Sequence, residues 1–459
     1  MQLTHLRVAN FRAIGSEPLD LEIRPISLFV GENGSGKSSL LEAIALSAQS
    51  ATEDERRMDL VLHGTKWSRT EKDAIDLVHG RREDATLEVG FTWQLEESDR
   101  PPVSAEGRPL FQRDDHSGLA QFGYAWKRTG RRFPVWEHQF SFAGQLVCSI
   151  RSEPTPLSAS PSDRHVLRLG SSTIEQPVRR EWPLLRNYER VLPPENFFLN
   201  SFNVLRGNEP PATSAEQSEL RAAAAISSAI SSFAQRWFRG VELLSTLRGR
   251  ELVETEPSQF DVASVGEHSE HLIRLLNSLE VRNKAGYEGV VSWASKFGLN
   301  SLAAGLRITR LALNFRGEDP LLRLGLDDAA TGSVQGLILA TQLLLSTVGA
   351  TLLIEEPENN LHPAWEVLLP ELFSDSLRAG HQVLATTHSE TLVAALVGAV
   401  RKGLLRPEDV AVFESERTQQ GVRARELPMT SRGLTEWVES FARVQQLLTQ
   451  DWVDGLPKE

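Results

Sequence analysis

The chain has 459 residues, of which 40% are hydrophobic, and a formal net charge of −12. This length suits a large core and, by itself, about three domains. The acidic balance gives no global basic field that would indicate a nucleic-acid partner. The single cysteine, Cys148, excludes an internal disulfide and is typical of a reducing compartment. The first residues lack the apolar core of a signal peptide, and no stretch approaches the roughly 20 apolar residues of a membrane span. Composition therefore predicts a cytoplasmic protein without a membrane anchor.

The most specific stretch, at residues 31–38, reads GENGSGKS. It matches the phosphate-loop pattern G-x-x-x-x-G-K-[ST] at every defined position. The apolar run at 26–30 predicts a strand before it, and 38–48 predicts a helix after it. Such a loop directs backbone N–H groups and the positive end of a helix dipole at a polyphosphate. We expect a nucleoside triphosphate to be bound by Gly31, Glu32, Asn33, Gly34, Ser35, Gly36, Lys37, Ser38 and Ser39. Within this set, Lys37 is expected to reach the β- and γ-phosphates and Ser38 to bind Mg²⁺.

The remaining chain alternates between strand and helix patterns. Alternation at 2–10 and 19–23 predicts paired strands, and further strands are expected at 85–94, 123–127 and 136–150. A Ser- and Pro-rich segment at 152–163 indicates a loop. Helical spacing follows at 213–247, 271–280 and 287–297, and an amphipathic helix is expected at 435–448.

An apolar strand at 351–354 ends in two carboxylates, Glu355 and Glu356. Phosphoryl transfer to water needs one carboxylate for the magnesium ion and a second that orients or deprotonates the attacking water. We therefore assign Glu355 to the metal and Glu356 to catalysis. An acidic strand end facing solvent is the alternative, which the phosphate loop in the same chain disfavours.

Two further motifs flank this strand. Residues 383–387 predict a second buried strand that is followed by His388, whose ring can donate to a phosphate oxygen. A lone histidine is more often structural, but a place one strand after the carboxylates resembles that of the γ-phosphate sensor in ABC-type ATPases, which implies a catalytic role for His388. The turn at 330–335 precedes an apolar helix, whose N-terminus is a second anion site. We expect this turn to contact nucleotide through Thr331, Gly332 and Ser333, with a simple helix cap as the alternative.

Together these motifs resemble the ABC-type ATPase heads of the RecF, SMC and OLD groups. The resemblance is carried by LRVANFR at 6–12, GENGSGKSSLLEAI at 31–44, IEEPENNLHP at 354–363 and TTHS at 386–389. It covers about the first 95 residues and 307–427, and it is thin between. It implies an α/β P-loop NTPase fold with a mixed central sheet, an antiparallel β subdomain and an inserted, mainly helical region. The implied domains are an N-terminal ATPase lobe at 1–122, a β-hairpin and helical insertion at 123–300, a C-terminal ATPase lobe at 301–430 and a helical tail at 431–459.

The resemblance also implies how such a head works. Two heads sandwich two ATP molecules, each phosphate loop faces the 331–333 turn of the opposite subunit, and hydrolysis requires dimerisation. Residues 359–362 would form the D-loop at that interface, and Arg12 would lie near the nucleotide. The Q-loop glutamine is not placed by the sequence, with Gln94 as one candidate. The chain after His388 has no D-x-D motif of a TOPRIM nuclease domain, so the head is expected to be stand-alone.

Three functions fit these motifs. The leading one is an ATP-hydrolysing switch that dimerises and regulates a separate effector protein, by analogy a nuclease, in phage defence or DNA repair. The second is a RecF-like repair ATPase that binds DNA directly, with Arg128, Arg131, Arg132 and the 178–189 stretch as its basic surface. The third is the ATP-binding subunit of a membrane transporter, which the long insertion and the EEPE-x-x-LHP run disfavour.

Overall fold

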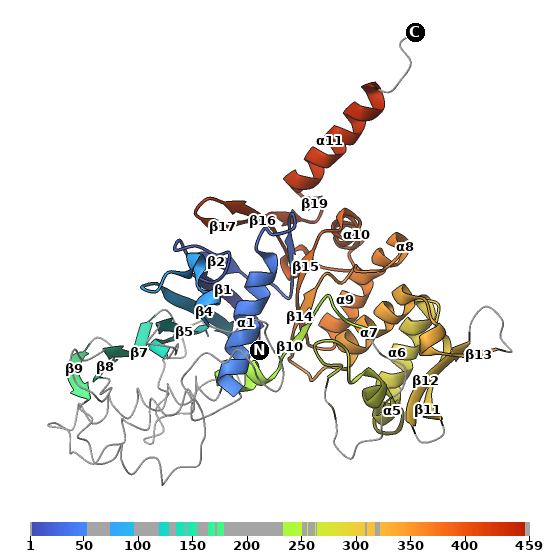
Figure 1. Ribbon diagram of the computed structural model, residues 1–459, viewed down its shortest axis with the longest axis horizontal. Helices are drawn as coiled ribbons and strands as arrows, with labels where there is room; N and C mark the ends of the chain where they lie inside the picture. The colour runs from blue at the N-terminus through green and yellow to red at the C-terminus, as the bar shows by residue number, and fades with distance from the viewer. Residues whose placement is uncertain are drawn as a thin grey trace. The chain divides into compact units, whose positions relative to one another are not determined.

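The computed structural model describes residues 2–52, 74–95, 119–127, 135–142, 145–153, 164–169, 172–178, 233–249, 255, 262, 264–307, 310–316 and 322–454. The chain forms two compact units (Figure 1). Unit 1 consists of Met1–Ile23, Glu42–Gly240 and Gln419–Gly421, and unit 2 of Arg24–Leu41, Val241–Thr418 and Val422–Glu459.

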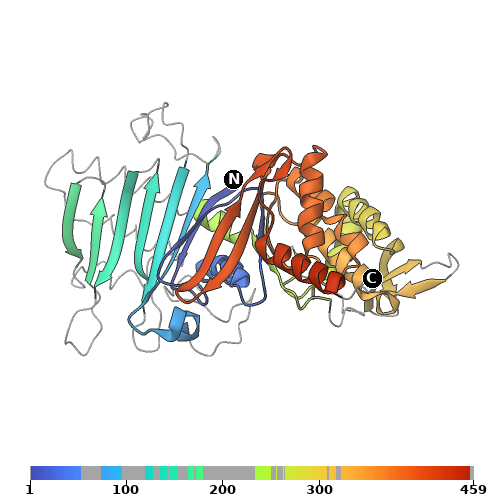
Figure 2. The same ribbon diagram turned by 90° about the horizontal axis from the view of Figure 1, so that it is seen from above.

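Unit 1 is built on an antiparallel sheet in the order β2-β1-β4-β5-β6-β7-β8-β9 (Figure 2). Side chains along β4 alternate between less and more buried positions, as expected where one face of a strand packs on a core. The strands are β1 (Gln2–Ala9), β2 (Leu19–Glu22), β4 (Thr86–Gln94), β5 (Leu119–Lys127), β6 (Val135–Phe142), β7 (Gln145–Glu153), β8 (Arg164–Leu169) and β9 (Ser172–Val178).

The core of unit 1 contains an aromatic cluster. Phe91 and Trp93 of β4 stack with ring centroids 5.8 Å apart. Helical residues 233–239 supply Phe233, Trp237 and Phe238, and the Trp93 and Trp237 centroids lie 5.4 Å apart. Such pairs stabilise by about 0.5–1.5 kcal/mol each beyond area burial. The cluster therefore fixes residues 233–239 against β4.

Unit 2 is built on a second sheet in the order β10-β14-β15-β3-β16-β17. The neighbours from β10 to β16 pair in parallel. β3 and β15 are buried along their whole length, as continuous apolar strands of a covered parallel sheet are. The strands are β3 (Ile26–Val30), β10 (Val241–Leu244), β14 (Thr351–Glu355), β15 (Gln382–Thr387), β16 (Val410–Thr418) and β17 (Gly421–Leu427).

Helices and two small sheets complete unit 2. Helix α7 is almost entirely buried and packs against α6 and α9. The helices are α5 (Leu272–Arg282), α6 (Lys284–Lys296), α7 (Thr331–Leu345), α8 (Pro363–Glu366), α9 (Leu369–Arg378), α10 (Glu390–Arg401) and α11 (Glu439–Asp454). The small sheets consist of β11 (Asn300–Arg307), β12 (Arg310–Arg316) and β13 (Arg323–Gly325), and of β18 (Met429–Thr430) and β19 (Gly433–Leu434). Helix α1 (Lys37–Thr52) begins in unit 2 and continues into unit 1.

The predicted fold class is confirmed, because a mixed central sheet and an antiparallel sheet are both present. The helical pattern at 213–247 was wrong at 241–244, which form β10. The apolar residues at 241–244 have helical spacing, but they form a strand because they pair in parallel with β14. This tertiary contact overrides the local helical preference of the sequence. Much of the predicted 123–300 insertion lies outside the described residues. Its described part contains strands β6 to β10 as well as helices, and the predicted domain boundaries stay a prediction.

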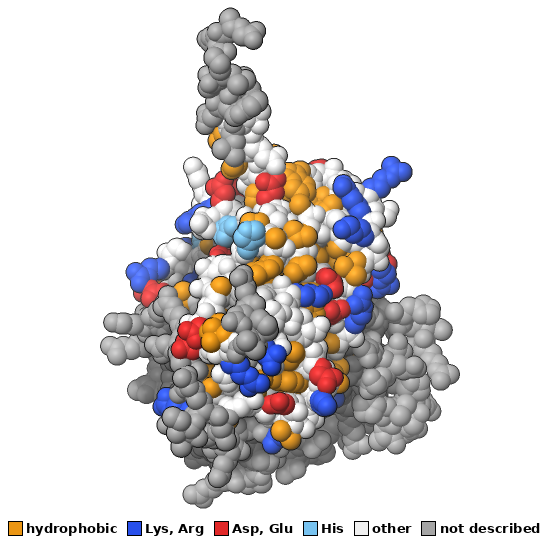
Figure 3. Space-filling model, turned by 90° about the vertical axis from the view of Figure 1, so that its right-hand side faces the viewer, with side chains coloured by type: hydrophobic (Ala, Val, Ile, Leu, Met, Phe, Trp, Pro, Cys, Tyr) orange, Lys and Arg blue, Asp and Glu red, His pale blue; other side chains and the backbone are white. Residues whose placement is uncertain are grey.

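The described surface carries no single dominant charge on the face shown in Figure 3, where acidic, basic and apolar side chains are intermingled. No helix in the described part of the chain is both long and apolar enough to cross a bilayer.

Candidate nucleotide site

Three parallel strands of unit 2 bring the predicted motifs to one edge of the sheet. β15 lies between β14 and β3, and its last residues pair in register with both: Thr386 with Glu355, and Thr387 with Val30. The phosphate loop, Glu356 and His388 each follow directly after these strand ends. The carboxyl ends of parallel strands are where α/β sheets bind ligands. The fold therefore unites motifs that are far apart in sequence.

The phosphate loop requires glycine at its first position. Gly31 has φ of +152°, and a Cβ there would lie 2.4 Å from the carbonyl oxygen of Ser415 and 2.9 Å from the Ser35 hydroxyl. The Ser35 N–H donates to the carbonyl of Glu32 at 3.2 Å, which closes the turn before α1 begins at Lys37. Only a residue without a side chain fits this cradle.

Lys37 is buried within its own loop, with only 5% of its surface exposed. Its Nζ donates to the carbonyl oxygens of Gly31 at 2.9 Å and Glu32 at 2.8 Å. Burial lowers the pKa of Lys37 from 10.5 to about 8, and the carboxylates of Glu356 and Glu358 oppose this shift. The ammonium group therefore lies close enough to these two carboxylates for their charges to stabilise its protonated form. To bind a phosphate, it must exchange its two carbonyl acceptors for phosphate oxygens.

Glu356 and His388 form a pair beside the loop. The Nε2 of His388 lies 3.4 Å from Oε1 of Glu356. Burial lowers the pKa of His388, and the charge of Lys37 lowers it further, while Glu356 and the backbone of Gly31 raise it. A neutral imidazole still carries one N–H that can donate to a carboxylate or a phosphate. The pair suits proton transfer at a bound water.

The backbone of Glu356 is unusual. Its φ of +45° lies in the left-handed region, which residues with a Cβ adopt rarely. Its N–H donates to the carbonyl oxygen of Thr386 at 3.0 Å, so the neighbouring strand helps to hold this conformation. Strained backbone of this kind collects at functional sites.

Glu358 belongs to the EEPE run at 355–358, but the sequence analysis assigns it no role. Its Oε1 accepts from the Thr387 hydroxyl at 2.7 Å and from the His388 N–H at 2.8 Å. Its other oxygen is buried without a hydrogen-bond partner among the described residues, and burial raises the pKa of its carboxyl group. Glu358 thereby links the loop after β14 to the strand end that carries His388.

Arg248 was missed altogether. It follows β10, the strand beside β14, and is 3% exposed. Its guanidinium donates to the carbonyl oxygens of Glu355 and Glu356, each at 2.7 Å. No sequence signal marks it, because its importance depends on the pairing of β10 with β14.

The 331–333 turn forms the start of α7. The residue before the helix, Ala330, provides no side-chain cap, and the nucleotide contact expected of Thr331, Gly332 and Ser333 stays a prediction. A Cβ on Gly332 would lie 2.7 Å from the carbonyl oxygen of Asn360. The turn therefore packs on the predicted D-loop of its own chain.

Some of the predicted residues lie in unit 1 or outside the described residues. Arg12 and Gln94 belong to unit 1, where Arg12 has φ of +49° and its Nε lies 2.7 Å from a carboxylate oxygen of Glu42. The nucleotide contact of Arg12 stays a prediction. The loop with Arg128, Arg131 and Arg132 and residues 179–189 lie outside the described residues.

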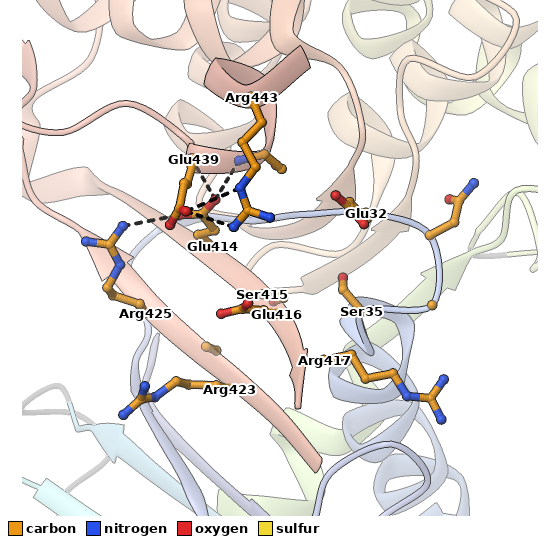
Figure 4. A pocket seen from close by; sticks show the side chains of 14 residues that line it. Glu32, Ser35, Glu414, Ser415, Glu416, Arg417, Arg423, Arg425, Glu439 and Arg443 are labelled. Carbon is orange, nitrogen blue, oxygen red and sulfur yellow. Dashed lines mark hydrogen bonds and ion pairs between the residues drawn. The ribbon is translucent and has the colours of Figure 1, made fainter. Parts of the chain in front are cut away.

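Within unit 2, a cavity of about 840 Å³ borders residues 32–35 of the phosphate loop (Figure 4). Its lining includes Glu32 and Ser35, strands β16 and β17, and the start of α11. Glu356 and His388 are not among its lining residues. Arg425 contacts both Glu414 and Glu436 there, so part of its charge is paired internally.

Comparison with known proteins agrees with this geometry. Residues 26–394 match the family described as "AAA domain, putative AbiEii toxin, Type IV TA system". The chain belongs to this family. It is thus a member of a P-loop ATPase family, in which a bound nucleotide and Mg²⁺ are typical.

Similar solved structures are SMC heads. The SMC head domain from Thermotoga maritima is 11% identical with a TM-score of 0.39, and the match covers 93% of this chain and 99% of that one. An SMC head bound to the C-terminal winged-helix domain of ScpA is 12% identical with a TM-score of 0.43, covering 94% and 98%. An SMC head with an extended coiled coil, bound to the C-terminal domain of ScpA derived from Pyrococcus furiosus, is 10% identical with a TM-score of 0.43, covering 97% and 99%.

The residues present fit a magnesium nucleotide. No group of three or more His, Cys, Asp or Glu side chains is arranged to hold a metal in the described ranges. Mg²⁺ usually keeps several waters and takes one or two carboxylates together with phosphate oxygens. Exposed Ser38 and partly exposed Glu355 could therefore hold Mg²⁺ that arrives with the nucleotide. The glycine cradle at Gly31 and the ammonium of Lys37 suit the triphosphate itself.

Proposed function

We propose that this protein is an ATP-hydrolysing switch whose ATP-bound form dimerises and regulates a separate effector protein. The observation that carries the proposal is the meeting of the phosphate loop, the carboxylate pair and His388 at one edge of the sheet in unit 2. These groups are the components that hydrolysis of a phosphoanhydride needs.

Binding rests on the loop and α1. Backbone N–H groups of residues 31–39 and the positive end of α1 surround the phosphates, and Lys37 turns its ammonium from the loop carbonyls to the β- and γ-phosphates. Ser38 and Glu355 would hold Mg²⁺, which neutralises charge on the triphosphate when it is bound.

Hydrolysis rests on Glu356. Its carboxylate accepts a proton from the attacking water, and its side chain is placed beside His388. The neutral ring of His388 donates its N–H to the γ-phosphate and so distinguishes ATP from ADP. Glu358 holds the backbone of His388 in place during this exchange.

Dimerisation rests on the N-terminus of α7. Because Ala330 at the N-cap provides no side-chain acceptor, the first-turn N–H groups of α7 are suited to the γ-phosphate held by a second copy. ATP then binds the closed dimer more tightly than the open one, and this difference in affinity is what shifts the population. The family description mentions a type IV toxin–antitoxin system, which supports a role beside another protein component.

Two variants test this function. Lys37→Ala should abolish nucleotide binding measured by calorimetry, because the phosphates lose their charged donor. Glu356→Gln should keep ATP binding, lower the hydrolysis rate by about 10²–10⁴-fold and accumulate an ATP-dependent dimer in light scattering. Hydrolysis by Glu356→Gln at the wild-type rate would remove Glu356 from catalysis.

The trapped Glu356→Gln dimer is also the form in which to identify the partner. With ATP present it should retain the effector in a pull-down from the source cells, and Lys37→Ala should not. Steeply salt-dependent binding of DNA by the same variant, without a protein partner, would instead favour the RecF-like function.

A further inference from the structure

The guanidinium of Arg248 is a buried charge. It is 3% exposed, and the charges of Glu358, Glu356 and Glu355 act on it, although its hydrogen-bond acceptors are all neutral oxygens. Burial lowers the pKa of Arg248 from 12.5 to about 10, which still leaves the group charged at neutral pH. A buried charge of this kind is costly unless every donor is satisfied.

All five N–H groups of Arg248 find an acceptor. Three acceptors are consecutive carbonyl oxygens at the end of β14 and in the loop that follows: Glu355 at 2.7 Å, Glu356 at 2.7 Å and Pro357 at 3.3 Å. The other two are the carbonyl oxygen of Ser245 at 3.0 Å and Oε1 of Gln335 at 2.7 Å. The side-chain amide of Gln335 donates back to the carbonyl oxygen of Arg248 at 3.0 Å.

These bonds hold the backbone of Glu356 on its carbonyl side. Thr386 holds the same residue on its N–H side, and the residue between these two anchors has φ of +45°. A conformation that local sterics disfavour persists only where the surroundings fix it. Fixing it determines where the carboxylate of Glu356 lies relative to His388.

Gln335 connects the same guanidinium to α7. It is 2% exposed and lies one turn after the 331–333 segment at the start of the helix. A displacement of α7 therefore reaches the carbonyl of Glu356 through two hydrogen bonds, Gln335 to Arg248 and Arg248 to Glu356.

We propose that Arg248 is a positioning residue that holds Glu356 in its catalytic conformation and couples it to the N-terminus of α7. The inference rests on the proposed ATPase function. Lysine cannot replace arginine in this role, because three donors on one nitrogen cannot reach five acceptors arranged around a planar fork.

The test measures ATP affinity, turnover and thermal stability of Arg248→Lys and Arg248→Ala. Both should lower kcat by at least about tenfold, as misplacement of a catalytic group does, while the Kd for ATP stays within about threefold because the phosphate loop is untouched. Guanidinium ion at low millimolar concentration should restore part of the kcat of Arg248→Ala, and methylammonium at the same concentration should not. Parallel losses of kcat and ATP affinity, without rescue, would overturn the positioning role.

Gln335→Ala tests the connection separately. It keeps the guanidinium but removes the link to α7, so kcat should fall with ATP affinity retained, and its effect should not add to that of Arg248→Ala. Additive effects, or an unchanged kcat, would overturn the coupling. This variant also carries the test if Arg248→Ala fails to fold. The exposed Arg323 in β13 is the matched control, and Arg323→Ala should behave as wild type.

The result separates this inference from the proposed function. If the wild-type protein hydrolyses no ATP, the proposed function fails. If Glu356→Gln loses turnover and Arg248→Ala keeps it, only the role of Arg248 fails.

Discussion

Lys37 is charged in surroundings that disfavour its charge. It is buried, and the two carbonyl oxygens it contacts are only partial compensation for lost water. Its pKa of about 8 is therefore a property of the loop before nucleotide binds. A triphosphate would add several negative charges beside the ammonium and raise this pKa again.

The affinity of the protein for ATP should therefore depend on pH and fall as the pH rises. In the proposed function the protonated form of Lys37 binds phosphate, so ATP affinity should be full below pH 8 and should fall as the pH rises above 8, by about tenfold for each pH unit. The Kd for a non-hydrolysable ATP analogue, measured from pH 7 to 9.5, should show this rise. The pKa of His388 is lowered from 6.5, so that ring does not titrate in this range.

Lys37→Arg provides the control for this measurement. Arginine stays charged across the range, so the weaker affinity of that variant should not change with pH. A wild-type Kd that stays constant up to pH 9.5 would mean that Lys37 is not the group that binds the phosphates in its charged form.

At the scale of elements, the sequence predicted what local patterns determine. β3, β14 and β15 are short apolar runs bounded by glycine, carboxylates or histidine, and all three were placed correctly. Their meeting at one edge of the sheet also follows once they pair in parallel, because the carboxyl ends of parallel strands lie at the same edge. β10 could not be predicted, because its residues have helical spacing and only its pairing with β14 makes it a strand.

The difference between local patterns and tertiary contacts also explains which site residues the sequence predicted. Lys37, Glu356 and His388 belong to contiguous motifs whose chemistry is readable. Arg248 acts on carbonyl groups more than a hundred positions away in the chain, which no local pattern reveals. Glu358 was visible, but its burial and its bond to His388 depend on the neighbouring strand.

The start of α7 allows a test of packing between two motifs. In Gly332→Ala the added Cβ would lie 2.7 Å from the carbonyl oxygen of Asn360 and 3.1 Å from the ring of Trp365. Because backbone and a tryptophan must both move, we expect a loss of about 1–3 kcal/mol in the free energy of unfolding. Urea unfolding with one probe in unit 2 measures it.

The matched substitution is Gly289→Ala in α6, where a Cβ would meet nothing within 4 Å. It should stabilise the protein by up to about 1 kcal/mol through helix propensity. Equal stabilities of Gly332→Ala and wild type would show that the turn and the predicted D-loop are not in tight contact.

At the scale of the whole molecule, the chain builds unit 2 from separated segments. The site collects residues 31–39, 248, 355–358 and 388, all from unit 2, while the intervening segment 42–240 belongs to unit 1. A site assembled from such distant segments forms only when the unit as a whole has folded, because long loops must close first. The geometry of the site and the stability of unit 2 are therefore linked.

The tail helix α11 is fixed to unit 2 at its start. Glu414 of β16 accepts from the N–H groups of Glu439 at 2.7 Å and Ser440 at 3.2 Å, which caps the helix. Val438, just before the helix, is fully buried. Further along, Val444 and Leu447 are 53% and 65% exposed. The buried and capping contacts thus lie before residue 444, and beyond it the exposed side chain of Gln445 donates to Glu390 of α10.

Two truncations test this division. Ending the chain after Arg443 removes mainly exposed residues, so the Tm should stay within about 2 °C of the full chain and ATP binding should be unchanged. Ending it after Thr435 also removes buried Val438 and the groups that Glu414 caps, which should lower the Tm by roughly 5 °C or more. Differential scanning calorimetry measures both. A large loss of Tm in the shorter deletion would show that the exposed part of α11 stabilises the fold. An unchanged Tm and ATP affinity, combined with loss of the ATP-dependent dimer, would instead assign that part to the contact between two copies.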